Sequence, residues 1–318
     1  MDAKLDGLGE RAIIKQIRRQ YDYSWPDDDC AFVENGREYL LLSTDSISRS
    51  EHIPDAAKYR TIGYFFAAVN LSDIAAMGGK PKYFMSALTL PKGMKLKELR
   101  ELERGMRKCL DRYDVKLIGG DLKPGRELNL SGTVMGIVPR KSILKRTGAH
   151  DGDIVCITGE LGRNAAGYYL WKQGGLRKGA EMLLKVEPRI WEGLAISEAG
   201  ASSAIDLSDG LFAALLQLRE ITSHGFEIDY SKVPINREAG LVSKRFGISI
   251  EDIAFDFGGE YELLFTVPRS RIKGLEAMAK SKGFKISRIG VVKGKECMLI
   301  KNGRKNRIKG HGYEHFSV

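Results

Sequence analysis

The amino-acid sequence predicts an α/β (α+β) protein built from two successive domains. Apolar, β-prone runs alternate with amphipathic helical segments along most of the 318 residues, which is the pattern of α/β and α+β folds. A chain of this length has room for two separate cores. Residues 139–150, PRKSILKRTGAH, interrupt the alternation. We therefore expect an N-terminal domain over residues 1–138 and a C-terminal domain over residues 139–318.

The N-terminal domain is expected to begin with an amphipathic helix and a hairpin. Asn35-Gly36 is a strong hairpin signal between the short expected strands 31–33 and 38–42. The apolar helix expected at 61–77 is ended by Gly78-Gly79. The other expected elements are the first helix within residues 1–22, strands 83–90, 115–118 and 128–138, and a charged helix at 96–113.

The C-terminal domain continues the alternation. Its expected strands are 153–158, 203–207, 226–228, 262–267 and 286–292, and its expected helices are 164–173, 188–200, 211–222, 236–246 and 270–282. The turn Gly159–Gly162 enters a helix, and such a turn offers backbone N–H groups to a phosphate. By itself this is a weak signal.

Composition excludes membrane and disulfide-stabilised classes. No apolar run approaches the ~20 residues that a membrane-spanning helix needs, and the N-terminus has no signal-peptide pattern. The four cysteines are far apart, without zinc spacing, so free thiols are expected. We expect a cytoplasmic protein.

The net charge of +10 is concentrated at the C-terminal end. From Arg269 to Val318 there are fourteen Lys/Arg and three Glu, a net charge of +11. Such a lobe is typical of nucleic-acid binding or of attraction to phosphorylated substrates. It has no interleaved aromatic residues and no nucleic-acid motif, so a solvated face is favoured and a nucleic-acid partner is not expected.

Carboxylates recur at the ends of the expected elements. Asp45 and Asp121 each follow a strand, and Asn70 and Asp73 share one face of an apolar helix. The full set is Asp28 or Asp29, Asp45, Asp73, Asp121, Asp206 and Asp209. Taken singly, each has an ordinary interpretation, and Ser208 or Asp209 would cap the helix that follows. The recurrence favours one shared site.

A convergent carboxylate set predicts a metal. Repulsion among such groups at low dielectric would amount to several kcal/mol without cations. Hard oxygen ligands without His or Cys select Mg²⁺, which commonly binds together with substrate phosphates. The chain contains no lysine-bearing P-loop and no protein-kinase motif set. The residues therefore predict Mg²⁺-dependent phosphoryl chemistry without naming the acceptor.

An ordered set of motifs resembles the thiamine-monophosphate kinase family. The set comprises DDCAFV, LLSTDS, AVNLSDIAAMGGKP, LIGGD, RTGAHDGD, AIDLSDGL, GGEYELLFTVP and GYEHF, and it spans Asp28 to Phe316. That family belongs to the superfamily of aminoimidazole ribonucleotide synthetase, selenophosphate synthetase and a hydrogenase-maturation protein. The resemblance implies the two-domain architecture of that superfamily, a homodimer formed through the N-terminal sheets, and ATP bound in a cleft by several Mg²⁺ ions.

The resemblance also implies an activity and a set of site residues. ATP would transfer its γ-phosphoryl group directly to thiamine monophosphate, giving thiamine diphosphate and ADP. The implied Mg²⁺ ligands are Asp29, Ser43, Thr44, Asp45, Asp73, Asp121, Asp206 and Asp209, of which Asp45, Asp73 and Asp209 are the expected catalytic residues. The implied nucleotide contacts are Gly120, Asp121, Arg146 and Ser208. The implied contacts to the thiamine phosphate are His52 and Glu260.

Departures from the family pattern keep alternatives open. Asp27 stands where the family has a glycine, and the family's G-G-E-D-Y-E-L is one Asp short at Gly258–Leu263. One alternative is a paralogous superfamily enzyme that uses ATP on another small acceptor. A second is a non-catalytic protein whose basic C-terminal lobe contacts nucleic acid.

Overall fold

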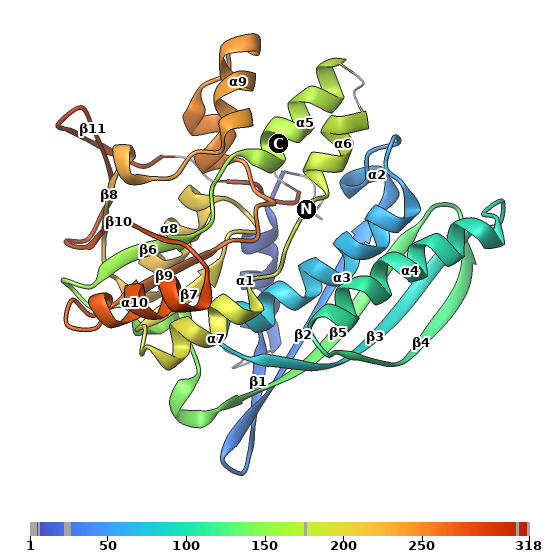
Figure 1. The fold of residues 1–318 in the computed structure, drawn as a ribbon, viewed down its shortest axis with the longest axis horizontal. Helices are drawn as coiled ribbons and strands as arrows, with labels where there is room; N and C mark the ends of the chain where they lie inside the picture. The colour runs from blue at the N-terminus through green and yellow to red at the C-terminus, as the bar shows by residue number, and fades with distance from the viewer. Residues whose placement is uncertain (1–4, 6, 22–26, 175–176, 310–311, 317–318) are drawn as a thin grey trace.

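Two mixed β-sheets and the helices between and around them form the protein (Figure 1). The computed structural model describes residues 5, 7–21, 27–174, 177–309 and 312–316. One sheet is built from residues 31–139 and the other from residues 154–307. The expected α/β class with two successive sheet units is confirmed.

The N-terminal sheet has five strands in the order β1-β2-β5-β3-β4. The strands are β1 (Ala31–Asn35), β2 (Glu38–Ser48), β3 (Lys80–Pro91), β4 (Lys116–Gly125) and β5 (Asn129–Pro139). The hairpin predicted at Asn35-Gly36 is confirmed, since Asn35 pairs with Glu38 at the end of an antiparallel ladder. Only β3 and β4 pair in parallel within this sheet.

Helix α3 (Tyr59–Ala76) is the central helix of the molecule. It contacts β2, β3 and β5 of the N-terminal sheet, and also β7 (Ser203–Asp206) and α7 (Ile190–Glu198) of the C-terminal half. Its neighbour α4 (Leu96–Arg112) lies very close, because a Cβ atom on Gly63 would sit 1.9 Å from the Leu102 carbonyl oxygen. A helix covered on all sides is apolar all round, so its few polar residues require specific partners.

The C-terminal sheet has seven strands in the order β12-β11-β8-β10-β6-β9-β7. The remaining strands are β6 (Ile154–Thr158), β8 (Phe226–Asp229), β9 (Leu263–Val267), β10 (Ile286–Val292), β11 (Cys297–Lys301) and β12 (Arg304–Arg307). The helices of this half, besides α7, are α5 (Arg163–Gly174), α6 (Arg177–Leu183), α8 (Leu211–Thr222), α9 (Arg237–Phe246) and α10 (Ile272–Lys282).

Two strands continue beyond their expected ends. β2 runs through Ser43, Thr44 and Asp45 to Ser48, and β4 runs through Gly120 and Asp121 to Gly125. These residues therefore lie within strands, where β5 and β3 supply the backbone pairing. The sequence analysis also missed the short basic hairpin of β11 and β12.

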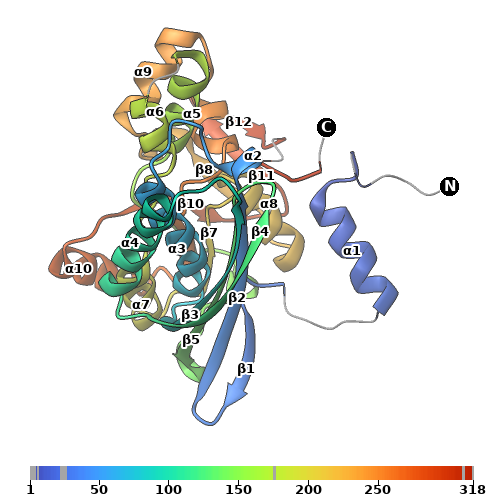
Figure 2. The same ribbon diagram turned by 90° about the vertical axis from the view of Figure 1, so that its right-hand side faces the viewer.

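The first helix, α1 (Glu10–Tyr21), lies at the edge of the molecule (Figure 2) and is joined to the C-terminal half by the ion pairs Arg11–Asp209 and Lys15–Glu220. A four-residue helix, α2 (Arg49–His52), follows β2 directly. All four cysteines are free and buried, as expected. In the part of the chain that the structure describes, no helix combines the length and apolar character needed to cross a membrane.

Candidate active site

Three carboxylates from distant parts of the chain meet between the two sheets. Ligand oxygens of Asp29, Asp73 and Asp206 all lie within 4.8 Å of one another. Asp29 precedes β1, Asp73 lies on α3, and Asp206 ends β7. We call these three residues the acidic centre. The predicted convergence of these carboxylates is thus observed, and both halves of the chain contribute.

Polar side chains on and beside α3 hold the acidic centre and its neighbour Asp45. Ser72 donates a hydrogen bond of 2.7 Å to Asp206 Oδ2, and Ser43 donates to Asp73 Oδ2. Asn70 accepts a 3.1 Å hydrogen bond from the Asp45 backbone N–H through its Oδ1 atom. It also donates one of 2.9 Å to the Phe66 carbonyl oxygen. These bonds satisfy polar groups that would otherwise destabilise a buried helix.

Burial and mutual repulsion raise the pKa values of the carboxyl groups at and beside the acidic centre. Burial raises the pKa of Asp206 to about 7, and the charge of Asp29 adds to the effect. Burial, followed by the charges of Asp45, Asp206 and Asp29, holds the pKa of Asp73 well above its usual range. The pKa of Asp45 is raised by burial and by Glu10 and Asp209. A bound cation would relieve this repulsion.

Arg146 connects the acidic centre to Asp209. Its guanidinium donates to Asp29 through Nη2 at 2.8 Å and to Gln217 Oε1 through Nη1 at 3.1 Å. Gln217 on α8 in turn donates to Asp209 Oδ2 at 3.2 Å. Arg146, predicted as a nucleotide contact, is therefore an ion-pair partner of the predicted metal ligand Asp29 in this structure.

The loop after β7 carries Ser208 and Asp209, and neither side chain caps α8. Gly210 is the N-cap residue, and it makes no side-chain hydrogen bond. The Asp209 side chain instead accepts a hydrogen bond from Arg11 Nη2 at 3.2 Å. The Asp209 carbonyl oxygen accepts one of 3.0 Å from the Tyr313 N–H. Both ends of the chain thus reach this loop.

Gly120 and Asp121 lie away from the acidic centre. Asp45 is in register with Gly132, Ser86 and Gly120 across the sheet, so three strand spacings of ~4.8 Å separate Gly120 from Asp45. The exposed Asp121 carboxylate pairs with Lys123 at 3.0 Å. Both predicted nucleotide contacts line a hollow of about 1090 Å³ between β4 and α4.

Thr44 points to the opposite face of the sheet from Ser43 and Asp45, because side chains alternate along a strand. Its hydroxyl donates to the Gly132 carbonyl oxygen at 2.7 Å. Thr44 and Asp121 are thus predicted metal ligands that the structure does not bring to the acidic centre.

His52 lies at the end of α2 beside the C-terminal segment. Its ring centroid is 5.5 Å from that of His315, and its Nδ1 atom accepts a hydrogen bond of 3.2 Å from the Ser48 N–H. Burial and the nearby His315 lower the pKa of His52. A neutral His52 with its proton on Nε2 follows.

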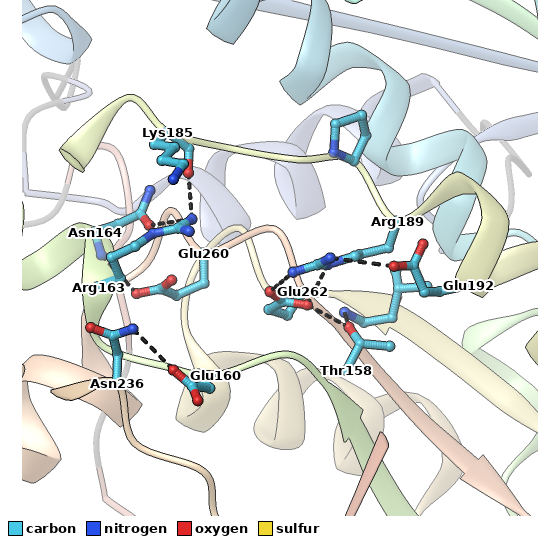
Figure 3. A network of polar contacts seen from close by, with 12 residues as sticks. Thr158, Glu160, Arg163, Asn164, Lys185, Arg189, Glu192, Asn236, Glu260 and Glu262 are labelled. Carbon is cyan, nitrogen blue, oxygen red and sulfur yellow. Dashed lines mark hydrogen bonds and ion pairs between the residues drawn. The ribbon is translucent and has the colours of Figure 1, made fainter. Parts of the chain in front are cut away.

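Glu260 occupies the N-terminus of α5 (Figure 3). Its Oε1 atom accepts hydrogen bonds from the N–H groups of Gly162 at 2.8 Å and Asn164 at 3.0 Å. The glycine-rich turn before α5 therefore binds a carboxylate of the same chain, so the N–H groups of Gly162 and Asn164 are not open to a phosphate in this structure. Burial raises the pKa of Glu260 to about 7.

The basic residues near the C-terminus are partly neutralised. In the hairpin of β11 and β12, Lys305 pairs with Glu227 at 2.5 Å and Arg307 with Glu296 at 3.0 Å, and Lys301 pairs with Glu251. These pairs reduce the local positive field that nucleic-acid binding would use.

Comparison with known proteins identifies the family. Residues 27–138 match the family model "AIR synthase related protein, N-terminal domain", and residues 150–298 match "AIR synthase related protein, C-terminal domain". The thiamine-monophosphate kinase of Pyrococcus horikoshii is 33% identical over 97% of this chain and 96% of its own. The chain belongs to the thiamine-monophosphate kinase family. The enzyme of that name from Buchnera aphidicola is also 33% identical, over 91% of both chains.

Solved structures of the thiamine-monophosphate kinase family share this fold. The structure described as "AaThiL complexed with AMPPCP and TMP" has a TM-score of 0.85 at 26% identity, over 97% of both chains. The thiamine monophosphate kinase from Aquifex aeolicus has a TM-score of 0.79 at 25% identity, over 92% of this chain and 97% of its own. A HypE-HypF complex, at 18% identity and a TM-score of 0.77, shares the fold alone.

The donors at the acidic centre fit a magnesium ion. They are carboxylates from both halves of the chain, with the hydroxyls of Ser43 and Ser72 bonded to them. Cys30 is buried nearby, and burial and the charge of Asp73 raise the pKa of its thiol, so it stays a neutral, poor ligand. Oxygen-only sites of this kind suit Mg²⁺.

The sequence analysis missed several residues that hold the site. No role was assigned there to Ser72, Arg11 or Gln217. The position of Ser72 beside Asp73 could have indicated a polar role. Nothing in the sequence places Arg11 or Gln217 next to Asp209, because these contacts join residues 198 and 8 positions apart through tertiary packing.

Proposed function

We propose that the protein is an ATP-dependent thiamine-monophosphate kinase. The observation that carries this proposal is the convergence of Asp29, Asp73 and Asp206, drawn from both halves of the chain, at one oxygen-only site. A family relative binds AMPPCP, a non-hydrolysable ATP analogue, together with TMP. The reaction is direct transfer of the ATP γ-phosphoryl group to thiamine monophosphate, giving thiamine diphosphate and ADP.

Mg²⁺ would be held by Asp29, Asp45, Asp73, Asp206 and Asp209, with the Ser43 hydroxyl beside them. When bound, it neutralises charge on the phosphate oxygens and orients them. Arg146, freed from Asp29, supplies a fixed guanidinium for a nucleotide phosphate. The Nε2 proton of His52 can donate to the acceptor phosphate, and no covalent intermediate on the chain is required.

Several finer features belong to the same proposal. Gly120, Asp121 and the hollow between β4 and α4 would take part of the nucleotide, and Thr44, Ser208 and Glu260 keep the roles that the family motifs imply. We propose a cytoplasmic homodimer with domains at 1–138 and 139–318. A second candidate is an ATP-dependent superfamily enzyme that acts on another small acceptor, which the shortened turn at Gly258–Leu263 favours.

Chromatographic product analysis tests the proposal. The purified protein is incubated with ATP, Mg²⁺ and thiamine monophosphate, with free thiamine as a parallel acceptor. We expect thiamine diphosphate and ADP from the monophosphate and no transfer to thiamine. Asp45→Asn should abolish turnover and leave the fold intact, whereas Asp151→Asn, in an exposed turn, should have no effect. If the protein binds ATP but forms no thiamine diphosphate, the second candidate is supported instead.

A further inference from the structure

Asn70 is a fully buried polar residue on the apolar helix α3, and the proposed function gives it no role. Its exposed fraction is 0%. Its Oδ1 atom accepts a hydrogen bond of 3.1 Å from the Asp45 N–H, and its Nδ2 atom donates one of 2.9 Å to the Phe66 carbonyl oxygen. A buried amide group destabilises a fold unless its hydrogen bonds are made. These two bonds therefore fix the amide between its own helix and strand β2.

Asp45 lies on a part of β2 that has a strand neighbour on one side. Within the residues that the structure describes, β1 pairs with β2 only as far as Leu42, whereas β5 pairs along the whole of β2. Helix α3 supplies a second support, because the Asp45 N–H donates to Asn70. The position of the Asp45 backbone therefore depends on a side chain of α3 as well as on strand pairing.

One face of β2 and one face of α3 meet beside the acidic centre. Ser43 and Asp45 are two residues apart and share a face of the strand. Asn70 and Asp73 are three residues apart and share a face of the helix. Ser43 donates a hydrogen bond to Asp73 Oδ2, next to the bond between Asp45 and Asn70. The face of β2 that carries the Asp45 side chain is thus held against the helix of the acidic centre at two points.

A glycine on β5 leaves the space that the Asn70 amide occupies. Gly132 is in register with Asp45, and a Cβ atom on Gly132 would lie 2.6 Å from Cγ, Oδ1 and Nδ2 of Asn70. This is far below the ~3.5–4.0 Å of a favourable contact. Any larger residue at this position would therefore push the amide away from the Asp45 N–H.

We propose that Asn70, in the space left by Gly132, is a positioning residue that holds Asp45 where its carboxylate can bind Mg²⁺. The amide acts through the Asp45 backbone. A neutral side chain is needed here, because a further carboxylate would add to the repulsion among the acidic residues. The inference rests on the proposed function, which names Asp45 as a Mg²⁺ ligand.

Two substitutions remove this support in different ways. Asn70→Leu replaces the amide by an apolar group of similar shape, and Gly132→Ala keeps Asn70 but displaces its amide. We expect each to weaken Mg²⁺ binding about 10- to 100-fold in titration calorimetry, the usual effect of losing a residue that orients a metal ligand. The rate of thiamine diphosphate formation should fall at limiting Mg²⁺ and recover as Mg²⁺ is raised, with an unchanged KM for thiamine monophosphate.

Gly136→Ala is the matched control, because it makes the same change on the same strand. A Cβ atom on Gly136 would lie 2.8 Å from Cγ2 of Ile74, so it presses on an apolar residue of α3, one helical turn beyond Asn70. We expect Gly136→Ala to lower the thermal unfolding midpoint, as Gly132→Ala does, and to leave the Mg²⁺ affinity unchanged. Equal losses of Mg²⁺ affinity in the two glycine variants would assign the effect to the packing of α3 and overturn the inference.

The outcomes also separate this inference from the proposed function. If the unsubstituted protein makes thiamine diphosphate, and Asn70→Leu and Gly132→Ala bind Mg²⁺ as tightly as it does, the inference is wrong and the function stands. If the unsubstituted protein binds Mg²⁺ but makes no thiamine diphosphate, the function fails and the Mg²⁺ titrations still decide the inference. If Asn70→Leu does not fold, Gly132→Ala decides alone. An unsubstituted protein that binds no Mg²⁺ would overturn both.

Discussion

At the scale of single residues, the buried carboxyl group of Glu260 makes the stability of the fold depend on pH. Its carboxyl is 4% exposed, and its pKa is raised from 4.5 to about 7, chiefly by burial. A carboxyl group whose pKa is higher in the folded state stabilises the fold fully at pH values below its unfolded-state pKa. This stabilisation is lost as the pH rises through its folded-state pKa. The pH window is therefore 4.5 to about 7.

We predict that Glu260→Gln removes this pH dependence. Relative to the variant, the metal-free protein should lose at most about 3 kcal/mol of unfolding free energy across the window, from 1.36 kcal/mol per pKa unit. Urea unfolding at about pH 5 and about pH 8 measures the difference. Glu160→Gln, an exposed carboxylate in the same region (Figure 3), is the control. Parallel pH profiles for the protein and Glu260→Gln would show that Glu260 does not titrate in this window.

Residue type and order along the chain predicted much of the candidate site. Asp29, Asp73 and Asp206 were expected to converge, and they do. The hydrogen-bond partners of the site residues could not be predicted from the sequence as well. The sequence did not indicate that the Glu260 carboxylate binds the N-terminus of α5, nearly 100 residues earlier in the chain. Side-chain direction and long-range hydrogen bonds depend on tertiary packing, which local patterns do not specify.

At the scale of elements, a buried ion pair joins α7 to the C-terminal sheet. Arg189 precedes α7, and Glu262 precedes β9. The Glu262 side chain is 5% exposed and the Arg189 side chain 25%. Removing one partner of a buried pair leaves an uncompensated charge, which costs about 3–5 kcal/mol.

We therefore predict that Arg189→Met lowers the unfolding free energy by about 3–5 kcal/mol, as measured by urea denaturation. Arg288→Met is the matched control, because Arg288 and Glu276 form a half-exposed pair of the kind worth about 1 kcal/mol or less. Adding Glu262→Gln to Arg189→Met should recover part of the loss. Equal losses for Arg189→Met and Arg288→Met would contradict a special role for the buried pair.

The predicted helices and strands differ from the observed ones where pairing with a neighbouring strand decides whether a segment is a strand. Helix α8 was predicted at its observed bounds, because its apolar pattern follows Gly210 directly. The extension of β2 through Ser43–Asp45 was missed, because polar residues reduce the β signal while β5 pairs with all of β2. The hairpin of β11 and β12 was missed although Asn302-Gly303 forms its turn, because β12 contains no apolar residue. Pairing with a neighbouring strand supplies what local propensity lacks.

At the scale of the whole molecule, no helix that the structure describes packs on one face of the N-terminal sheet. Helices α3 and α4 cover the other face (Figure 2). Side chains alternate along a strand, so residues next to the buried Leu41 and Phe84 point outward. Among them Leu42 is 37% exposed, Tyr83 38% and Met85 45%, and Val33 on β1 is 53% exposed. Exposed apolar residues gathered on one face indicate a protein interface.

The homodimer that we propose would bury this face against the same face of a second copy, since a twofold interface is self-complementary. Sedimentation equilibrium should therefore give twice the chain mass. Met85→Lys places a charge on this face, opposite the same charge of the second copy, and should yield monomers with an unchanged circular dichroism spectrum. Leu96→Lys, at an equally apolar and more exposed position on α4, should remain a dimer. A monomeric unsubstituted protein would refute the dimer, and a dimer that survives Met85→Lys but dissociates with Leu96→Lys would move the interface to the helical face.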